Sequence, residues 1–276
     1  MKLHYIFILN YVYTFGYKTH KYLGNYLDVY LNKTNPILYS NIISTLQDNT
    51  IEGVSIWADT MKKKKGYTWT RTLHYIDITD CNNTITNKIL DNYCQDKCIV
   101  SAITDFVHSF KTGYPLNKKY FGNSNGNLTK NELLKFIIHF IQDFNQPMHL
   151  LGYDAGGNGF EVITKQHSGR NKSSNVHYLW DTLIPEFYTK HYNFVYKRSE
   201  TSEIKNENYL NKLLLQMLNI NLQIGCKVYP KSNYIIFDEY FNHKDIELLF
   251  NNYMIMSLEI LMYLFNENKL LHFQIL

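Results

Sequence analysis

Long apolar runs, interdomain linkers and internal repeats are all missing from this 276-residue sequence. Beyond the N-terminus, no stretch reaches the roughly 18 apolar residues of a transmembrane helix, and the stretch from Met254 to Phe265 is expected to be a core helix. With 5 prolines and no Pro- or Ser-rich segment, the chain is expected to fold as one domain. The net charge of +4 is too small for the chain to bind nucleic acid by charge alone.

Apolar residues, by contrast, are abundant at 45%, and aromatic residues make up 16%, which excludes a disordered chain. Apolar residues recur at helical spacing from residue 20 to 47, with a break near Asn35-Pro36. A second helix is predicted to begin at a capping box formed by Thr129 and Glu132 and to end close to Pro147.

Further along the chain, residues 153–159 form a predicted turn, and residues 160–164 a predicted strand of a hairpin. Another helix is expected to carry residues 177 and 181 and to be kinked or ended by Pro185. The polar stretch 197–212 is interpreted as an exposed insertion, and a long helix over 244–265 closes the fold. The sequence therefore predicts a mainly α, single-domain multi-helix bundle with a small β-hairpin.

The N-terminus is typical of a secretory leader, because Lys2 precedes a short apolar stretch. Residues 1–14 are the expected leader, with residues 15–276 as the mature domain; a buried first strand is the alternative. Four cysteines favour disulfides in an oxidising compartment, although a C-x-x-x-C spacing is also compatible with metal binding. Four N-x-S/T sequons agree with a secreted glycoprotein; they begin at Asn32, Asn82, Asn127 and Asn171.

The most informative feature is an ordered series of His and Asp residues. The segment HFIQDFNQPMH contains His139, Asp143 and His149, and the segment HYLWD contains His177 and Asp181. Residues four apart lie on one face of a helix, so each H-x-x-x-D pair directs an imidazole and a carboxylate to one point. These are ligand types that zinc accepts. Candidate ligands upstream are Asp59, His74 and His20, although either of these histidines alone would be interpreted as an ordinary core residue.

This series, together with the GGN segment, resembles the zinc-dependent single-strand nuclease family of fungi and plants, the S1/P1 nucleases. That family shares its helical fold with bacterial zinc phospholipase C. The resemblance extends over nearly the whole chain from Phe15 onward. It implies a fold of the phospholipase C/single-strand nuclease type, three bound Zn²⁺ ions and a hydrolase of single-stranded RNA and DNA.

The resemblance also implies specific ligand sets. The amine and carbonyl of Phe15, once exposed by cleavage after Thr14, would bind one zinc together with His20 and Asp143. Asp143 would bridge to a second zinc held by Asp59, His74 and His139. The third zinc would be held by His149, His177 and Asp181. The family's disulfide pattern corresponds to Cys81 with Cys226 and Cys94 with Cys98.

Asp59 and Asp143 are the expected catalytic carboxylates, because two zinc ions sharing a ligand lower the pKa of water from roughly 15.7 to about 7. The products would be 5′-phosphorylated. By resemblance, Tyr75 would stack on a base, Asp77 and Asn158 would bind its edge, and Lys62 would contact a phosphate. The following run Lys63–Lys65 is typical of a solvated face, with nucleic-acid contact as the alternative. Manganese in place of zinc stays open.

Two departures from the family pattern stand out, Thr19 in place of Gly and Asn145 in place of a second His. The first is expected to affect the terminal loop, and the second lies outside the ligand set. The expected location is the extracellular space or the lumen of the secretory or endolysosomal pathway. Nucleotides and single strands are the expected substrates, no stable protein partner is implied, and no membrane span is expected. The alternatives are a phospholipase C acting on lipid and a metal-binding protein without catalysis.

Overall fold

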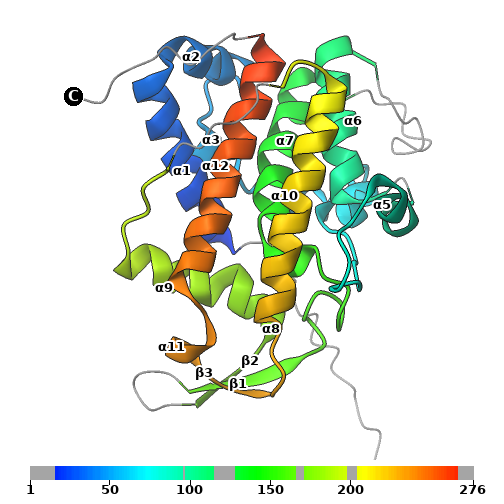
Figure 1. The fold of residues 1–276 in the computed structure, drawn as a ribbon. Coiled ribbons are helices and arrows are strands. Elements are labelled where there is room, and N and C mark those ends of the chain that lie inside the picture. Colours follow the sequence, from blue (N-terminus) through cyan, green and yellow to red (C-terminus); the bar gives the residue numbers. More distant parts are fainter. Residues whose placement is uncertain (1–15, 96, 115–127, 166–170, 198–203, 267–276) are drawn as a thin grey trace, which may run out of the picture.

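The computed structural model describes residues 16–95, 97–114, 128–165, 171–197 and 204–266. Helices dominate, which confirms the predicted class (Figure 1). The α-helices are α1 (Tyr17–Thr34), α2 (Pro36–Thr45), α3 (Ile51–Val54), α4 (Trp57–Met61), α5 (Asn87–Cys94), α6 (Ile99–Thr112), α7 (Lys130–Phe144), α8 (Val176–Tyr178), α9 (Ile184–His191), α10 (Glu207–Val228), α11 (Phe237–Tyr240) and α12 (His243–Phe265). Two 3₁₀ helices, η1 (Thr68–His74) and η2 (Pro147–His149), and a π-helix, η3 (Leu179–Leu183), complete the helical elements of the described chain.

Helix α7 is the centre of the fold, because it is buried on every side from Phe136 to Phe144. Helices α1, α4, α6 and α12 all pack against it. Figure 1 shows α12 and α10 crossing in front of α7, with α1 and α6 at the flanks. The capping box at its start is present as predicted: the Thr129 hydroxyl accepts from the Glu132 amide, and the Glu132 carboxylate accepts from the Thr129 amide.

Two other predicted helix boundaries are confirmed. Asn35 separates α1 from α2, and its side chain accepts from the Leu38 amide, so the break also begins the next helix. The closing helix occurs as α12. By length and hydropathy α12 is capable of crossing a membrane, but 78% of its apolar window is buried in the fold. It is therefore a core helix, as expected for Met254 to Phe265.

The predicted hairpin is part of a three-stranded sheet with the order β2-β1-β3. Strand β1 (Glu161–Lys165) pairs antiparallel with β2 (Asn171–Asn175), with Ile163 opposite Ser173. It also pairs in parallel with β3 (Tyr234–Ile236), a strand that the sequence did not predict. The sheet lies below α8 and α9 in Figure 1, and β2 leads directly into the helix that carries His177.

Two predictions about the second half of the chain need correction. Of the two effects predicted for Pro185, ending the helix is wrong, because the chain stays helical to His191, with the π-helix η3 directly before α9. Proline cannot donate to the carbonyl oxygen of Asp181, four residues earlier, and that oxygen accepts instead from the Gly16 amide and the Thr19 hydroxyl. The stretch 197–212 is not wholly an exposed insertion either. Its last six residues begin α10, where Leu210 is buried in the core, while residues 198–203 lie outside the described chain.

Two disulfides hold the periphery of the fold, and they have the pairing that the family resemblance implies. Cys81 is bonded to Cys226 on α10, across 145 residues of sequence. Cys94, at the end of α5, is bonded to Cys98, just before α6. The C-x-x-x-C segment is therefore a disulfide and not a metal site. Both bonds are typical of a protein from an oxidising compartment.

Candidate metal centre

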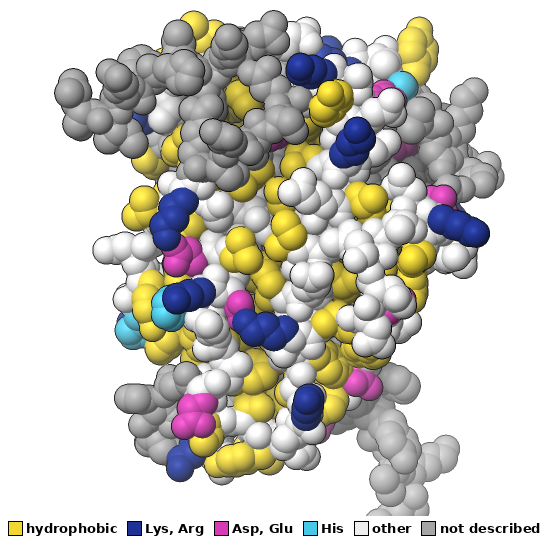
Figure 2. Space-filling view, in the orientation of Figure 1, with side chains coloured by type: hydrophobic (Ala, Val, Ile, Leu, Met, Phe, Trp, Pro, Cys, Tyr) yellow, Lys and Arg dark blue, Asp and Glu magenta, His cyan; other side chains and the backbone are white. Residues whose placement is uncertain are grey.

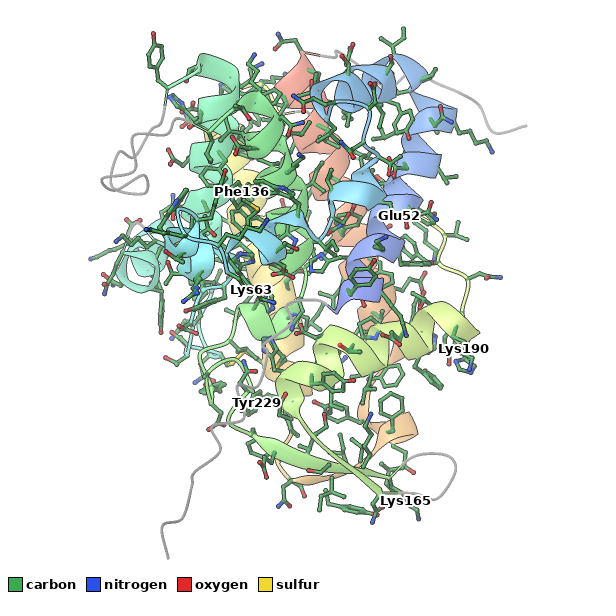
Figure 3. All side chains as sticks on the ribbon, turned by 180° about the vertical axis from the view of Figure 1, so that it is seen from behind. Glu52, Lys63, Phe136, Lys165, Lys190 and Tyr229 are labelled. Carbon is green, nitrogen blue, oxygen red and sulfur yellow. A yellow bond between two sulfur atoms is a disulfide. The ribbon has the colours of Figure 1, made fainter. Side chains whose placement is uncertain are left out.

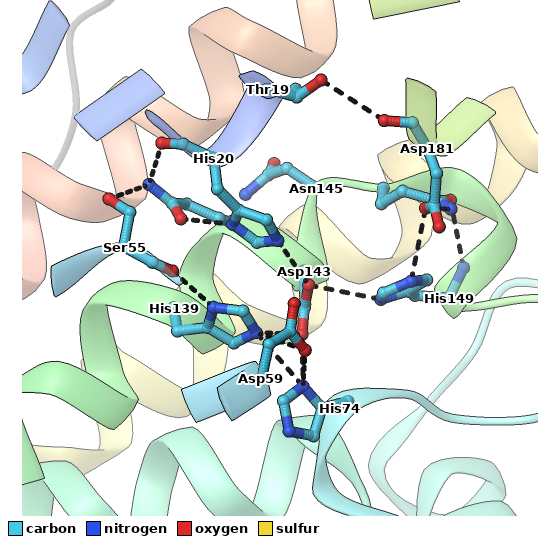
Figure 4. Close-up of polar contacts among 12 residues, drawn as sticks. Thr19, His20, Ser55, Asp59, His74, His139, Asp143, Asn145, His149 and Asp181 are labelled. Atoms are coloured by element: carbon cyan, nitrogen blue, oxygen red, sulfur yellow. Dashed lines mark hydrogen bonds and ion pairs between the residues drawn. The ribbon is translucent and has the colours of Figure 1, made fainter. Parts of the chain in front are cut away.

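Helix α7 supplies the two central side chains of the site. His139 and Asp143 are four residues apart on its buried face, and His139 Nε2 lies 3.0 Å from Asp143 Oδ2. On its other side, His139 Nδ1–H donates to the Ser55 carbonyl oxygen at 2.6 Å. That hydrogen bond fixes the tautomer and leaves Nε2 to face the site. Figure 4 shows Asp143 at the middle of the constellation.

Two ligand candidates reach His139 from the segment before α5. Asp59 on α4 places Oδ1 3.5 Å from His139 Nε2, and His74 at the end of η1 places Nδ1 3.7 Å from the same Asp59 oxygen. His74 Nδ1 also lies 2.7 Å from Asp143 Oδ2. One ligand atom from each of Asp59, His74 and His139 falls within 4.8 Å of the others, which is the predicted second set.

His20, in the first turns of α1, lies on the opposite side of Asp143. Its Nε2 is 3.4 Å from Asp143 Oδ1, and its Nδ1–H donates to Gln142 Oε1 at 2.5 Å. His20, His139 and Asp143 form a further group that could hold a cation. Phe15, the predicted terminal ligand, lies outside the described residues. The next residue, Gly16, donates its amide to the Asp181 carbonyl oxygen at 2.6 Å, so the chain enters beside the site.

Gly16 is required at this entry point. A Cβ atom on it would lie 2.5 Å from the Thr182 hydroxyl oxygen, which is too close for any other residue without displacement. Thr19, one of the two departures from the family pattern, is buried in the same turn and its hydroxyl donates to the Asp181 carbonyl oxygen at 3.3 Å. Thr19 thus contributes to anchoring the start of α1.

The third set consists of His149 in η2, His177 in α8 and Asp181 in the π-helix η3. His177 Nε2 on α8 lies 3.2 Å from Asp181 Oδ2 on the π-helix, and His149 Nε2 lies 3.7 Å from Asp181 Oδ1. The π-helix η3, which carries Asp181, is a kind of distortion that recurs at functional sites. His177 Nδ1–H donates to the Gly156 carbonyl oxygen at 2.7 Å, which directs Nε2 inward. Gly156 lies in the predicted turn, where its φ of +64° favours glycine.

The residues fit cations well. All eight described ligand side chains are buried except Asp59, which is partly buried. Several inward atoms, among them Asp143 Oδ1, His149 Nδ1, His177 Nε2 and Asp181 Oδ2, have no hydrogen bond from the described residues. They face one another across gaps such as the 3.7 Å between His149 Nδ1 and Asp143 Oδ1. Buried polar atoms are normally satisfied, so such a set indicates a site that could hold cations, and imidazole with carboxylate is a ligand combination that zinc accepts.

The electrostatics support the same interpretation. Burial would raise the pKa of Asp143, but the neighbouring His139 and His149 hold it well below its usual value. Burial lowers the pKa of His139, yet Asp143 and Asp59 outweigh it and raise that pKa to about 10. Burial lowers the pKa of His74 to about 3. A proton therefore favours His139, between two carboxylates, and a metal ion that binds there must displace it.

The predicted substrate residues border this centre. Lys62 Nζ lies 2.6 Å from Asp59 Oδ1 and is largely buried. Tyr75 directly follows His74 and is 39% exposed. Partial burial raises the pKa of Asp77. The segment that contains Tyr75 and Asp77 runs beside residues 149–152, since the Ile76 and Ile78 amides donate to the carbonyl oxygens of His149 and Leu150. Asn158 lies in the turn that follows, where its side-chain amide donates to the Ala155 carbonyl oxygen at 2.8 Å.

The sequence reasoning missed the side chains that orient the ligands. Gln142 Nε2 donates to the His20 carbonyl oxygen and to Ser55 Oγ, each at 3.2 Å. Gln146 Nε2 donates to Asp181 Oδ1 at 2.5 Å, and Gln146 Oε1 accepts from the amides of Met148 and His149. Two glutamines close to Asp143 in the sequence, one in the buried part of α7 and one two residues beyond its end, were the available signal. Asn145, the second departure, instead joins a buried amide network with Asn221 on α10.

Comparison with known proteins gives a consistent result. Nuclease S1 of Aspergillus oryzae is 30% identical over 147 residues, which are 53% of this chain and 46% of that protein. Endonuclease 4 of Arabidopsis thaliana is 27% identical over 190 residues, 67% of this chain and 60% of that protein. Nuclease P1 of Penicillium citrinum is 27% identical over 146 residues, 52% of this chain and 48% of that protein. The chain thus spans about half the length of the curated relatives it matches. A profile of the S1/P1 nuclease family matches residues 15–243, most of the sequence, and the chain therefore belongs to that family.

Proposed function

We propose that this protein is a secreted, zinc-dependent nuclease that hydrolyses single-stranded RNA and DNA and leaves 5′-phosphates. Removal of phosphate from 3′-nucleotides is a second reaction expected of the same site. The observation that carries the proposal is the position of Asp143, whose two carboxylate oxygens face His20 and His74 from opposite sides within one buried cluster. A carboxylate placed in this way can join two metal ions.

Three zinc ions would be held by the ligand sets. The first would use His20, Asp143 and the backbone amine and carbonyl of Phe15, after removal of residues 1–14. The second would use Asp59, His74, His139 and Asp143, and the third His149, His177 and Asp181. When bound, zinc supplies Lewis acidity for the phosphodiester and lowers the pKa of water toward neutrality.

The surrounding residues would select the substrate. Tyr75 is exposed enough to stack on an unpaired base, a contact worth about 1–3 kcal/mol that does not depend on base identity. Asp77 and Asn158, on two adjoining segments, would bind the base edge. Stacking of this kind requires a base free of its partner strand, which supports a preference for single strands. Lys62, next to the ligand Asp59, would contact a phosphate.

The test is hydrolysis of single- and double-stranded oligonucleotides before chelation, after chelation and after zinc is restored, with product ends read by mass spectrometry. We expect single strands to be cut to 5′-phosphates, activity to be lost on chelation, and zinc to restore it. N-terminal sequencing should show a chain that begins at Phe15, and peptide mapping should show which of the exposed sequons at Asn32, Asn82 and Asn171 carry sugar.

Two outcomes would reject the proposal. Zinc-loaded protein that begins at Phe15, cuts no oligonucleotide and instead releases phosphocholine from lipid would be a phospholipase C. Zinc-loaded protein that acts on neither class would be a metal-binding protein without catalysis.

A further inference from the structure

The positive charge of this chain is concentrated in one short segment beside the metal centre. Residues 60–76 contain five of the 28 basic residues and no acidic one. The other 259 residues therefore carry 23 basic and 24 acidic residues and are close to neutral. The charge of +5 on this segment exceeds the net charge of +4 of the whole protein, so the excess positive charge of the protein lies in this segment.

The segment begins directly after Asp59, one of the candidate ligands. Lys62 is paired with Asp59, and the next three residues, Lys63, Lys64 and Lys65, are exposed. Figure 3 shows Lys63 on the face seen from behind. On the opposite face, shown in Figure 2, Lys and Arg side chains are scattered, and several of them lie beside Asp or Glu side chains.

The loop that carries these lysines is held in place by its backbone. The Lys64 amide donates to the Met61 carbonyl oxygen at 2.8 Å, and the Tyr67 amide to that of Lys64 at 3.1 Å. Arg71 Nε reaches back and donates to the Lys62 carbonyl oxygen at 2.9 Å, which brings a further exposed cation to the loop. The charges are thus presented by an ordered loop, which reduces the entropic cost of binding a ligand.

We infer that Lys63, Lys64, Lys65 and Arg71, here called the basic ridge, bind backbone phosphates of a single-stranded nucleic acid several nucleotides away from the bond that is cut. This inference rests on the proposed function and adds a second point of attachment. A strand whose scissile phosphate lies at the zinc cluster would continue past Asp59 over the ridge. The ridge would therefore favour long strands over dinucleotides, which offer it no phosphate.

In the ridge variant, Lys63, Lys64 and Lys65 are each replaced by Gln, and every proposed ligand is left intact. The matched control replaces Lys33, Lys205 and Lys212, which are exposed on α1 and near the start of α10, so that it removes the same charge elsewhere. Binding of a labelled 20-nucleotide phosphorothioate strand to the zinc-loaded protein is measured by fluorescence anisotropy from 50 to 200 mM salt. Hydrolysis of a dinucleotide and of an unmodified 20-nucleotide strand is measured in parallel.

Each phosphate contact with a single strand contributes about −0.7 to the slope of log affinity against log salt. Three lost contacts should make that slope shallower by about 2, so the affinity deficit of the ridge variant should shrink roughly 20-fold between 50 and 200 mM salt. Dinucleotide hydrolysis should change less than about twofold, and the control variant should match the unaltered protein.

An unchanged slope in the ridge variant, or an equal change in the control, would overturn the inference. So would loss of binding to anionic phospholipid vesicles without any change toward the strand, which would assign the ridge to a membrane surface. If the unaltered protein binds the strand through the ridge but cuts neither substrate, the proposed function fails and the ridge stands. If the unaltered protein cuts both substrates and the salt slopes of the unaltered, ridge and control proteins agree, the inference about the ridge fails and the proposed function stands.

Discussion

Replacing Gln146 with Met should weaken zinc binding at the third site selectively. Gln146 joins two of the three ligands there, because its amide nitrogen donates to Asp181 Oδ1 at 2.5 Å and its oxygen accepts from the His149 amide at 3.2 Å. Met has a similar volume, so the buried position stays filled while both polar contacts are lost. Carboxylate and histidine ligands that lose such support bind metal about 10- to 100-fold more weakly, or roughly 1.4 to 2.7 kcal/mol.

Gln142, on α7 four residues earlier, offers a matched variant. His20 Nδ1–H donates to Gln142 Oε1 at 2.5 Å, and among the described residues Gln142 has no hydrogen bond to His149, His177 or Asp181. Gln142→Met should therefore weaken the first site and spare the third. Zinc affinity is measured by competition with a chelator, and anomalous diffraction from crystals of each variant identifies the depleted ligand set. Loss of the same ion from both variants, or affinity changes below twofold, would refute the reasoning.

Three further predictions follow from the site and the disulfides. Tyr75→Ala should lower kcat/KM for an oligonucleotide about 5- to 150-fold through lost stacking, while Tyr75→Phe should retain most activity; equal losses in both variants would contradict a stacking role. Metal affinity at His139 should rise with pH, because its pKa of about 10 keeps a proton there at neutral pH that the metal must displace; titration calorimetry in several buffers should show proton release, and affinity should fall about tenfold per pH unit of acidification for each proton displaced. Replacing the Cys81–Cys226 pair with Ser should lower stability by up to about 5 kcal/mol, against about 2 kcal/mol for Cys94–Cys98, because the longer loop of 145 residues restricts the unfolded chain more; equal shifts of the denaturation midpoint would argue against this explanation.

The sequence predicted helix boundaries correctly where a few neighbouring residues determine them. The capping box at Thr129 and the Asn35-Pro36 break fix helix boundaries within four residues, and both are present. Helices α5, α6 and α10 were not predicted. At the start of α10, polar residues 207–212 outweigh the apolar ones, although the buried positions from Leu210 to Val228 recur at helical spacing. Strand β3 has three residues and depends on its pairing with β1.

The site divides in the same way. The i, i+4 spacing of His139 with Asp143 is local and identified them as candidate ligands from the sequence, whereas the assignment of His20, Asp59 and His74 depended on the family resemblance. The orientation of the ligands could not be predicted, since it depends on tertiary contacts such as the one between His139 and the carbonyl oxygen of Ser55, 84 residues away. A backbone carbonyl is present at every residue and leaves no signature in the sequence.

The burial of α7 has a consequence for when the protein can become active. Every described ligand side chain has been synthesised once residue 181 is made, yet α7, which carries two of them, is covered by α12, and its C-terminal end by α10. These helices occupy residues 207–265 and contain none of the ligands. A growing chain would therefore carry a complete set of ligands without the packing that fixes them. The candidate metal site can therefore assemble only after the chain has been synthesised to about residue 265, so metal binding would accompany or follow the folding of the C-terminal helices and would not precede it.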